Sequence, residues 1–215
     1  MINHIISQTL KGKTINRLLM NFELLSLTIS GKILELGGGR IKSSYFQFLQ
    51  LKEPAEVTSI DIASERQPDI IADLEKPLPC SDGQFDAVLC VNLLEHIFQY
   101  RQLVAESYRV LKSGGKLIGY VPFLVKVHPD PNDYFRYTAQ SLEHILRDVS
   151  FTGIQVRYVG RGPLTAAWSQ CEYILPRVVR WVVTLTVFAL DNFLLRLKPV
   201  FREKYPLGYV FIGIK

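Results

Sequence analysis

The sequence predicts an α/β fold with a doubly wound, mostly parallel sheet, and three observations support this. Short runs of β-type residues alternate with helical stretches from residue 30 onward, as in a parallel sheet with helices on both faces. One run, Phe85–Val91, is apolar almost throughout, as expected for a strand that is covered on both sides. The first run, Lys32–Leu36, ends in three glycines, a turn at which a ligand can approach the backbone closely.

The elements on either side of the first strand follow from the same periodicities. Residues 1–29 are predicted to form an N-terminal helical cover, because apolar side chains recur there at helical spacing. These side chains are Leu10, Leu18, Leu19, Phe22, Leu25 and Leu27. After the first strand and a helical stretch, the expected elements are strand Val57–Asp61, short strand Ile70–Asp73, helix Arg101–Leu111, strand Lys116–Val121 and a helix through Leu142–Leu146 capped by Thr138.

Residues 163–205 form a segment rich in apolar and basic residues, and this segment is predicted to be a helical insertion. Its apolar run Trp181–Leu190 is bounded by charged residues and is shorter than the roughly 20 apolar residues that a membrane span needs. No transmembrane span is therefore predicted. Basic residues flank the run, as in an interfacial helix, and a lid packed on the core explains the pattern equally well. These residues are Arg177, Arg180, Arg196, Lys198, Arg202 and Lys204.

Composition and charge exclude several classes of protein. The 215 residues are 48% hydrophobic and 21% charged, which indicates one globular domain over 1–215 and excludes a disordered chain. Three widely separated cysteines exclude a disulfide framework and a thiolate zinc site, no other metal site is predicted, and a reducing, cytoplasmic compartment is expected. The net charge of +5 is milder than that of a dedicated nucleic-acid binder. The N-terminal segment lacks the pattern of a signal peptide.

The glycine turn after the first strand favours a cationic ligand. Gly37 and Gly39 form G-x-G, but Lys42 stands where the dinucleotide fingerprint has its third glycine. Glu35 would repel a pyrophosphate and attract the ammonium and sulfonium groups of S-adenosylmethionine. Asp61 follows about twenty residues later at a strand end, the usual place for a carboxylate that binds ribose hydroxyls. The pattern therefore favours S-adenosylmethionine over a nicotinamide dinucleotide.

An ordered set of short motifs over roughly residues 30–160 resembles the class I S-adenosylmethionine-dependent methyltransferases. The motifs are Glu35–Gly39, Ser59–Asp61, Asp73–Pro79, Asp82–Val88, Val91–Ile97 and Arg109–Gly115. The chain looks most like the small-molecule branch that includes ubiquinone and menaquinone methyltransferases, although Ile41 replaces a third glycine of the family's longer motif. The resemblance implies a seven-stranded sheet whose last strand is antiparallel. Phe151–Val156 and Tyr209–Lys215 would be its last two strands, separated by the helical insertion.

The resemblance also implies roles for individual residues in binding the cofactor. The residues so implied are Glu35, Gly37 and Gly39 at the methionine half, Asp61 at the ribose, Ile62, Asp73 and Leu74 at the adenine, and Asn92 near the sulfonium. His96 is expected to lie at the start of the adjacent helix. A capping or packing role for His96 and a role at the substrate both remain open.

A proline-rich loop after the fifth strand carries a second group of chemically active residues. In a fold of this kind the loop faces the transferred methyl, so His128 and Tyr134 are predicted to lie near the acceptor. His128 is the best general-base candidate because the pKa of an ordinary histidine lies near neutrality. Asp133 and Arg136 are expected to pair and brace the loop. Positioning can supply much of the rate of methyl transfer, so the need for a base stays open.

These features together predict a methyltransferase that acts on a hydroxyl or carboxyl group of a small or lipid-linked acceptor, such as a quinone precursor, a lipid or a glycan on a lipid carrier. Residues 173–204 are predicted to touch a membrane, with Trp181 and Phe188 entering it. This contact would place the protein in the cytoplasm at the inner membrane face. A nicotinamide-dependent oxidoreductase and a non-catalytic S-adenosylmethionine-binding protein are the alternatives. No nucleic-acid partner is expected. Methyltransferases that act on a flipped base carry an N-P-P-Y-type tetrad after the fourth strand, and this chain has Val91–Leu94 there.

Overall fold

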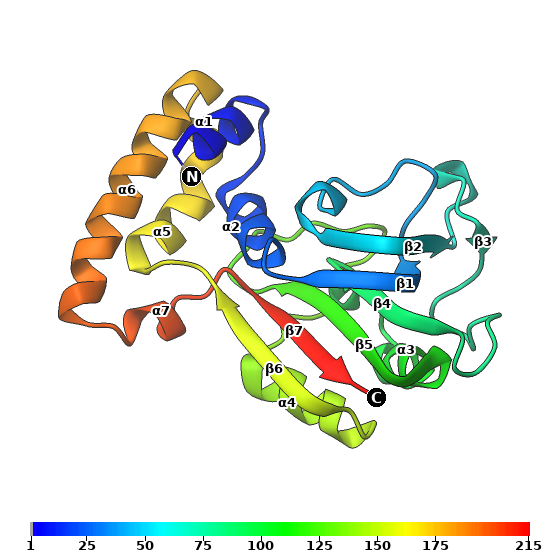
Figure 1. Cartoon of the computed structure of the whole chain (residues 1–215). Coiled ribbons are helices and arrows are strands. Elements are labelled where there is room, and N and C mark those ends of the chain that lie inside the picture. The colour runs from blue at the N-terminus through cyan, green and yellow to red at the C-terminus, as the bar shows by residue number, and fades with distance from the viewer. Residues whose placement is uncertain (1) are drawn as a thin grey trace.

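The computed structural model of the chain describes residues 2–215, which fold around one seven-stranded sheet (Figure 1). The strand order is β3-β2-β1-β4-β5-β7-β6, and β7 runs antiparallel to both of its neighbours while the pairs from β3 to β5 are parallel. The strands are β1 (Thr28–Leu36), β2 (Gln50–Asp61), β3 (Ile70–Ile71), β4 (Phe85–Val91), β5 (Leu111–Pro122), β6 (Thr152–Val159) and β7 (Gly208–Ile214). The predicted fold class is confirmed, including the antiparallel last strand.

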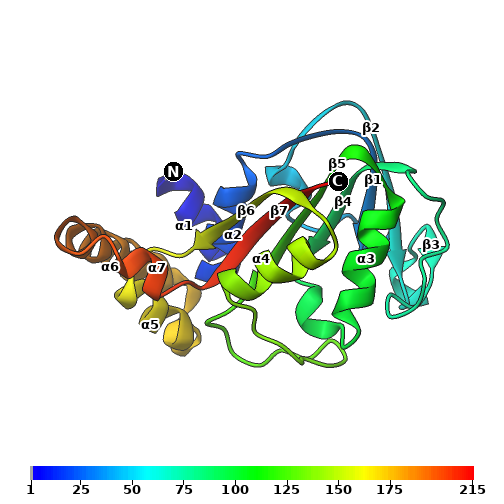
Figure 2. The ribbon, with the colours of Figure 1, turned by 90° about the horizontal axis from the view of Figure 1, so that it is seen from below.

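Helices cover both faces of this sheet. The α-helices are α1 (Ile2–Leu10), α2 (Ile15–Leu24), α3 (Tyr100–Val110), α4 (Ala139–Asp148), α5 (Pro163–Cys171), α6 (Arg177–Leu197) and α7 (Phe201–Lys204). Short 3₁₀ helices are η1 (Phe46–Phe48), η2 (Ser64–Arg66), η3 (Leu94–His96) and η4 (Glu172–Ile174). One apolar core lies under α3 and α4, and the other is shared by α1, α2, α5 and α6 on the opposite side (Figure 2).

The apolar character of β4 follows from its central position. Its neighbours β1 and β5 pair with it on both edges. Successive side chains of a strand point to opposite faces, and here Ala87 and Leu89 join one core while Val88 and Cys90 join the other. All four side chains are at most 2% exposed, so a strand in this place needs apolar residues on both faces.

The connection between β1 and β2 differs from the prediction. A helical stretch is expected before Val57, but the structure has only the single turn η1 there, and β2 already begins at Gln50. Tyr45, Phe46 and Phe48 of this connection are buried in the same core as α2. The N-terminal helix α2 therefore shares the cover of this face with a short aromatic turn, where a crossover helix was expected.

The N-terminal segment forms two helices separated by a turn at Gly12, whose φ of +81° favours glycine. The predicted apolar stripe is correct in its middle, where Leu18 and Leu19 are buried, and wrong at Leu10 and Leu25, which are 44% and 41% exposed. The first strand begins at Thr28, just inside the range 1–29 assigned to the helical cover.

The segment between β6 and β7 folds into α5, η4, α6 and α7, which stand beside the sheet (Figure 1). The helix α6 is longer than the apolar run suggested. Its 21 residues make it the one helix among residues 2–215 that is long and apolar enough to cross a membrane by length and composition. One side of α6 packs on α1 and α5. Its buried Asp191 accepts hydrogen bonds from the backbone N–H groups of Leu164 and Thr165 at the start of α5.

Candidate active site

A cavity of about 310 Å³ lies at the carboxyl ends of β1, β2 and β4. Its lining includes six of the residues predicted to bind the cofactor, namely Gly37, Asp61, Ile62, Asp73, Leu74 and Asn92. Gly37 makes the turn out of β1, with a φ of +72° and an N–H group that donates to the carbonyl of Ile60. The cavity lies where ligands bind in open α/β sheets, outside the carboxyl ends of the strands. We refer to it below as the cofactor cavity.

Asp61 is held in place by two donors at the end of β2. Its Oδ1 accepts from the backbone N–H of Ala63 at 2.9 Å, and its Oδ2 accepts from Arg66 Nη1 at 2.9 Å. The other guanidinium nitrogen of Arg66 reaches Asp130 Oδ2 at 2.7 Å, so Arg66 ties the end of β2 to the loop after β5. Sequence reasoning missed Arg66, because its partner Asp130 lies far along the chain.

Glu35 and Gly39 are not among the residues that line the cofactor cavity, contrary to the expectation for the methionine half. The carboxyl group of Glu35 is buried, and its Oε1 accepts from the Tyr45 hydroxyl at 2.8 Å. Burial raises the pKa of Glu35, which weakens the argument that a full negative charge attracts the ligand. A Cβ at Gly38 would lie 2.4 Å from Glu35 Cδ, so the middle glycine makes room for this carboxyl group. Gly39 lines a separate hollow together with Arg66.

Two further cavities, of about 210 and 550 Å³, adjoin the cofactor cavity, and we call them the acceptor cavities. Asn92, in the left-handed region at φ +51°, lines all three cavities. Thr14 and Asn16 at the start of α2 line both acceptor cavities, and Glu172 and Tyr173 of η4 line the smaller one. The N-terminal cover and the insertion thus both contribute side chains to the site, which the sequence analysis did not predict.

The loop after β5 separates the two residues predicted near the acceptor. His128 lines both acceptor cavities. Tyr134 instead lines the cofactor cavity, where its ring meets Phe98 edge-on at 5.3 Å, and this places it away from His128. Arg136 forms an ion pair with Asp133 at 2.7 Å. Asp133 also accepts a hydrogen bond from the backbone N–H of His128 at 2.9 Å. Arg136 holds the pKa of Asp133 well below its usual range, so this pair braces the loop.

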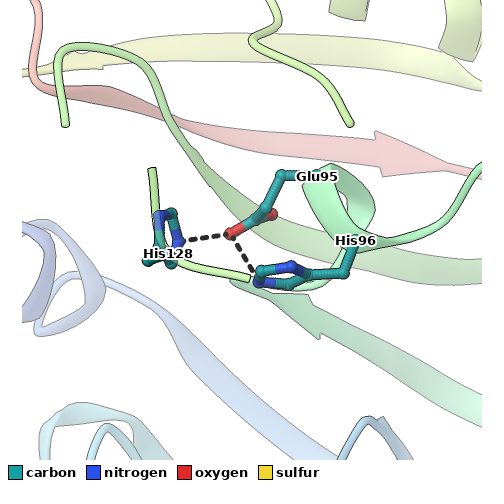
Figure 3. Close-up of side chains that lie close together, drawn as sticks. All are labelled: Glu95, His96 and His128. Carbon is teal, nitrogen blue, oxygen red and sulfur yellow. Dashed lines mark ion pairs between the residues drawn. The ribbon is translucent and has the colours of Figure 1, made fainter. Parts of the chain in front are cut away.

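Glu95, His96 and His128 form a cluster of side chains (Figure 3), and its two histidines line the cavities described above. The side chain of Glu95 is fully buried, and its Oε1 lies 3.6 Å from the Nε2 atoms of both histidines. This contact with Glu95 is the main cause that raises the pKa of His128. His96 ends η3, whereas α3 begins only at Tyr100, so the expectation that His96 starts the next helix is wrong. Sequence reasoning missed Glu95, because its partner His128 lies in a loop distant along the chain.

Comparison with known proteins gives the same fold. A family model described as a methyltransferase domain matches residues 34–119. The chain resembles Haemonchus contortus phosphoethanolamine N-methyltransferase 2, solved in complex with S-adenosylmethionine, with a TM-score of 0.59 at 14% identity over 91% of this chain and 52% of that one. It resembles a SAM-dependent methyltransferase from Archaeoglobus fulgidus with a TM-score of 0.57 at 17% identity, over 94% and 93% of the two chains.

One curated relative matches a short segment. An uncharacterised protein of Methanocaldococcus jannaschii is 51% identical over 41 residues, which is 19% of this chain and 18% of that protein. The chain therefore spans about half of the Haemonchus contortus enzyme and less than a fifth of the archaeal protein. At identities this low the likeness to solved structures shows the fold, and the family match includes most of the residues that line the cofactor cavity, all but those of the loop after β5.

Proposed function

We propose that the chain, whose residues 34–119 match a methyltransferase domain, is an S-adenosylmethionine-dependent methyltransferase that methylates an oxygen atom of a small or lipid-linked acceptor. The observation that carries the proposal is the position of Asn92. This residue lines the cofactor cavity and both acceptor cavities, so a methyl group beside it can be reached from the acceptor side. Methyl transfer requires the attacking atom, the methyl group and the sulfur atom to lie in line, and cavities on two sides of Asn92 leave room for this arrangement.

Cofactor binding is assigned to the carboxyl ends of β1 and β2. Asp61 is proposed to accept hydrogen bonds from the ribose hydroxyls. For this to happen, Arg66 has to release the Oδ2 atom of Asp61, to which it now donates. The Arg66 side chain is 42% exposed, so a guanidinium released from Asp61 stays hydrated and keeps its ion pair with Asp130. Ile62, 61% exposed at the rim of the cavity, is proposed to cover the adenine.

The acceptor side supports an oxygen nucleophile. His128 lines both acceptor cavities and is the proposed base that takes the proton of an acceptor hydroxyl while the oxygen attacks the methyl group. The bond from sulfur to methyl breaks as the oxygen–methyl bond forms, and S-adenosylhomocysteine leaves. A carboxylate acceptor is already ionised near neutral pH and would need no base.

The insertion supports a hydrophobic acceptor presented at a membrane. Along α6 an apolar stripe recurs at helical spacing and faces solvent. Its members are Val178, Val182, Leu190, Phe193 and Leu197, each between 46% and 68% exposed. The start of α6 follows Tyr173, which lines the smaller acceptor cavity, so a membrane along this helix would lie next to the acceptor. A quinone precursor, a lipid, or a glycan on a lipid carrier fits this arrangement.

Two residues expected to enter the membrane need correction. Phe188 is 4% exposed and packs in the core under the guanidinium of Arg161, 4.4 Å from its ring. Trp181 is only half-buried but does not belong to the exposed stripe. Arg180 also turns back, donating to the carbonyl of Leu175 at 2.8 Å. The proposed membrane contact therefore uses the stripe that includes Val182 and Phe193 in place of Trp181 and Phe188.

The decisive experiment incubates the protein with S-adenosylmethionine labelled in its methyl group and with lipid, glycan and soluble extracts of its source. We expect the label to appear in the lipid extract. Mild base should release this label only if the acceptor is a carboxyl group, because base hydrolyses a methyl ester and leaves a methyl ether intact. Label confined to the soluble extract would overturn the lipid-linked acceptor. Binding of S-adenosylhomocysteine without transfer to any extract would identify a non-catalytic binding protein, and binding of NAD⁺ in its place would identify an oxidoreductase.

A further inference from the structure

Glu95 is a buried carboxylate whose oxygens lack hydrogen bonds. Its side chain is 0% exposed, and within residues 2–215 neither Oε1 nor Oε2 has a hydrogen-bond partner. An ionised carboxylate in such a place is costly unless a partner compensates the lost hydration, and buried charges are accordingly paired or bound to a metal ion. The groups that face Glu95 therefore decide what this carboxylate does.

Two imidazole rings converge on one oxygen of this carboxylate (Figure 3). Nε2 of His96 and Nε2 of His128 each lie 3.6 Å from Glu95 Oε1, and the three potential ligand atoms lie within 4.8 Å of one another. The rings meet edge-on with their centroids 5.3 Å apart. Glu95 and His96 come from η3 after β4, whereas His128 comes from the loop after β5, so the fold assembles the cluster from distant segments.

The other nitrogen of each ring is already occupied by a backbone carbonyl. His96 Nδ1 lies 2.5 Å from the carbonyl oxygen of Asn132, and His128 Nδ1 lies 3.0 Å from that of Lys126. A ring nitrogen beside a carbonyl oxygen carries the proton, so in each neutral ring the lone pair is on Nε2, the atom that faces Glu95. Histidines that bind metals are oriented in this way, with the second N–H donated to a carbonyl or carboxylate.

We propose that Glu95, His96 and His128 bind a zinc-class divalent ion, a site whose metal binding does not depend on methyl transfer. With Nε2 of His128 on the ion, the ion takes over from His128 the task of activating the acceptor oxygen. Two imidazoles and one carboxylate form the three-residue ligand set of open zinc sites. Zinc bonds of about 2.0–2.1 Å at tetrahedral angles place ligand atoms roughly 3.3–3.4 Å apart. The two separations from Glu95 Oε1, 3.6 Å each, need to close by only a few tenths of an ångström, and a rotation of the His128 ring on its loop can bring the two Nε2 atoms, which lie within 4.8 Å, to the same spacing. Magnesium prefers oxygen ligands in an octahedron, so this set selects against it.

The cluster lies where a bound ion could contact the acceptor. His96 lines the cofactor cavity and the larger acceptor cavity, and His128 lines both acceptor cavities. Three protein ligands leave a fourth position for water or for an oxygen atom of the acceptor. An oxygen held there would sit beside the cofactor cavity, and a bound cation lowers the pKa of a water or hydroxyl that it binds.

The test is calorimetric titration of the full chain, stripped of metal by a chelator, with ZnCl₂ and in parallel with MgCl₂. We expect one equivalent of zinc to bind and no saturable binding of magnesium. The affinity for zinc should fall about a hundredfold or more in His128→Ala and in Glu95→Gln, because each removes one of three ligands. The matched control is His144→Ala, which removes an exposed histidine on α4 outside the cluster and should leave zinc binding unchanged.

A thermal melt of each sample reports whether the variant is folded, and S-adenosylhomocysteine is titrated into the same samples to test the proposed function separately. His128 is on a surface loop, so its alanine variant stays informative even if Glu95→Gln does not fold. Zinc that binds the wild-type protein and His128→Ala equally well would belong to another site, such as the cysteines, and would overturn the proposal. So would a wild-type protein that binds S-adenosylhomocysteine but no zinc. Loss of cofactor binding with zinc binding intact would count against the proposed function alone.

Discussion

At the scale of single residues, Asp61 has two roles, because the same carboxylate bonds Ala63 and Arg66 and is proposed to bind the ribose. We expect Asp61→Asn to weaken S-adenosylmethionine binding by roughly 1.5–3 kcal/mol, since charge-assisted hydrogen bonds to the ribose are lost. The amide can still accept from Ala63, so the local turn should persist. Calorimetry of the folded variant measures the change.

Arg66→Gln is the matched control for this prediction. It keeps the Asp61 carboxylate and removes the guanidinium that binds Asp61 and Asp130. Because the ribose has to displace this guanidinium, the variant should bind the cofactor as well as the wild-type protein or better. Equal affinities in the wild type and Asp61→Asn would exclude Asp61 from the cofactor site.

His128 is the residue at which the acceptor chemistry can be tested separately from cofactor binding. We expect His128→Ala to lower turnover on the acceptor by about a hundredfold or more, the usual effect of losing a general base. Affinity for S-adenosylhomocysteine should not change, because His128 lines the acceptor cavities and not the cofactor cavity. Turnover at the wild-type rate would mean that positioning alone drives the transfer.

Short-range motifs explain why most of the residues predicted to bind the cofactor lie together at one cavity. Gly37, Asp61 and Asn92 each follow directly on a strand, so a local pattern locates them at the same edge of the sheet. Glu95 could not be located in this way, because its significance depends on His128 in a distant loop. The place of Tyr134 at the cofactor cavity could not be predicted for a related reason, since its ring meets Phe98 edge-on, in a segment that the sequence does not link to it.

At the scale of elements, Glu172 of η4 joins the insertion to the N-terminal helix α2. Both of its carboxylate oxygens lie 3.2 Å from the backbone N of Ile15, the first residue of α2, where a negative charge is favourable. Burial is nevertheless the larger effect and raises the pKa of Glu172 to about 7, from a usual value of 4.5. The hydrogen bond from Ile15 favours the ionised carboxylate, but the cost of burying the charge is larger, so Glu172 stabilises the fold least when it is ionised.

This pKa predicts how stability depends on pH. The folded chain binds the Glu172 proton more tightly than the unfolded chain, so its contribution is present in full below about pH 4.5 and is lost as pH rises through about 7. Glu172→Gln keeps an acceptor for Ile15 but cannot ionise. It should match the wild type near pH 4 and be more stable at pH 8, by on the order of 2–3 kcal/mol.

Urea denaturation of both proteins at pH 4 and pH 8 measures this difference. The matched control is Glu53→Gln, which removes an exposed carboxyl group on β2 and should change stability equally little at both pH values. If the difference in free energy of unfolding between the wild type and Glu172→Gln is the same at pH 4 and pH 8, Glu172 does not titrate in this range.

Elements were predictable where one periodicity acts over a sufficient length. The strand β4 is apolar on both faces, and α4 begins at Thr138, whose side chain accepts from the Ser141 N–H as a helix cap. The connection between β1 and β2 was not predictable, because three aromatic residues bury themselves there in a single turn. The length of α6 was missed because Asp191 interrupts the apolar run in sequence, although in the fold it caps α5.

At the scale of the whole molecule, α6 forms the outer edge of the helical block beside the sheet (Figure 1). Its apolar stripe, defined above, faces solvent along the helix, and the flanking basic residues that are exposed lie at its two ends. These are Arg177, Arg196, Lys198, Arg202 and Lys204. An apolar stripe edged with basic residues is the arrangement of a helix that lies in a membrane interface.

We expect the protein to sediment with vesicles that contain anionic lipid. Each basic residue near such a surface contributes on the order of 1 kcal/mol, and this part fades as salt rises, whereas burial of the stripe does not. Binding should therefore fall at high salt without vanishing. The double variant Val182→Ser, Phe193→Ser should lose the binding that persists at high salt, since it removes two exposed apolar side chains of the stripe.

Exposed apolar residues elsewhere on the chain provide the control for this measurement. Ile41 and Ile71 are 90% and 62% exposed and lie outside the insertion, so Ile41→Ser, Ile71→Ser should sediment like the wild type. Because all four substituted side chains are solvent-exposed, neither variant should lose much stability, and thermal melts check this. Wild-type protein that stays in the supernatant at low salt would refute the membrane contact. The stripe would then need another cover, and the acceptor would reach the site from solution.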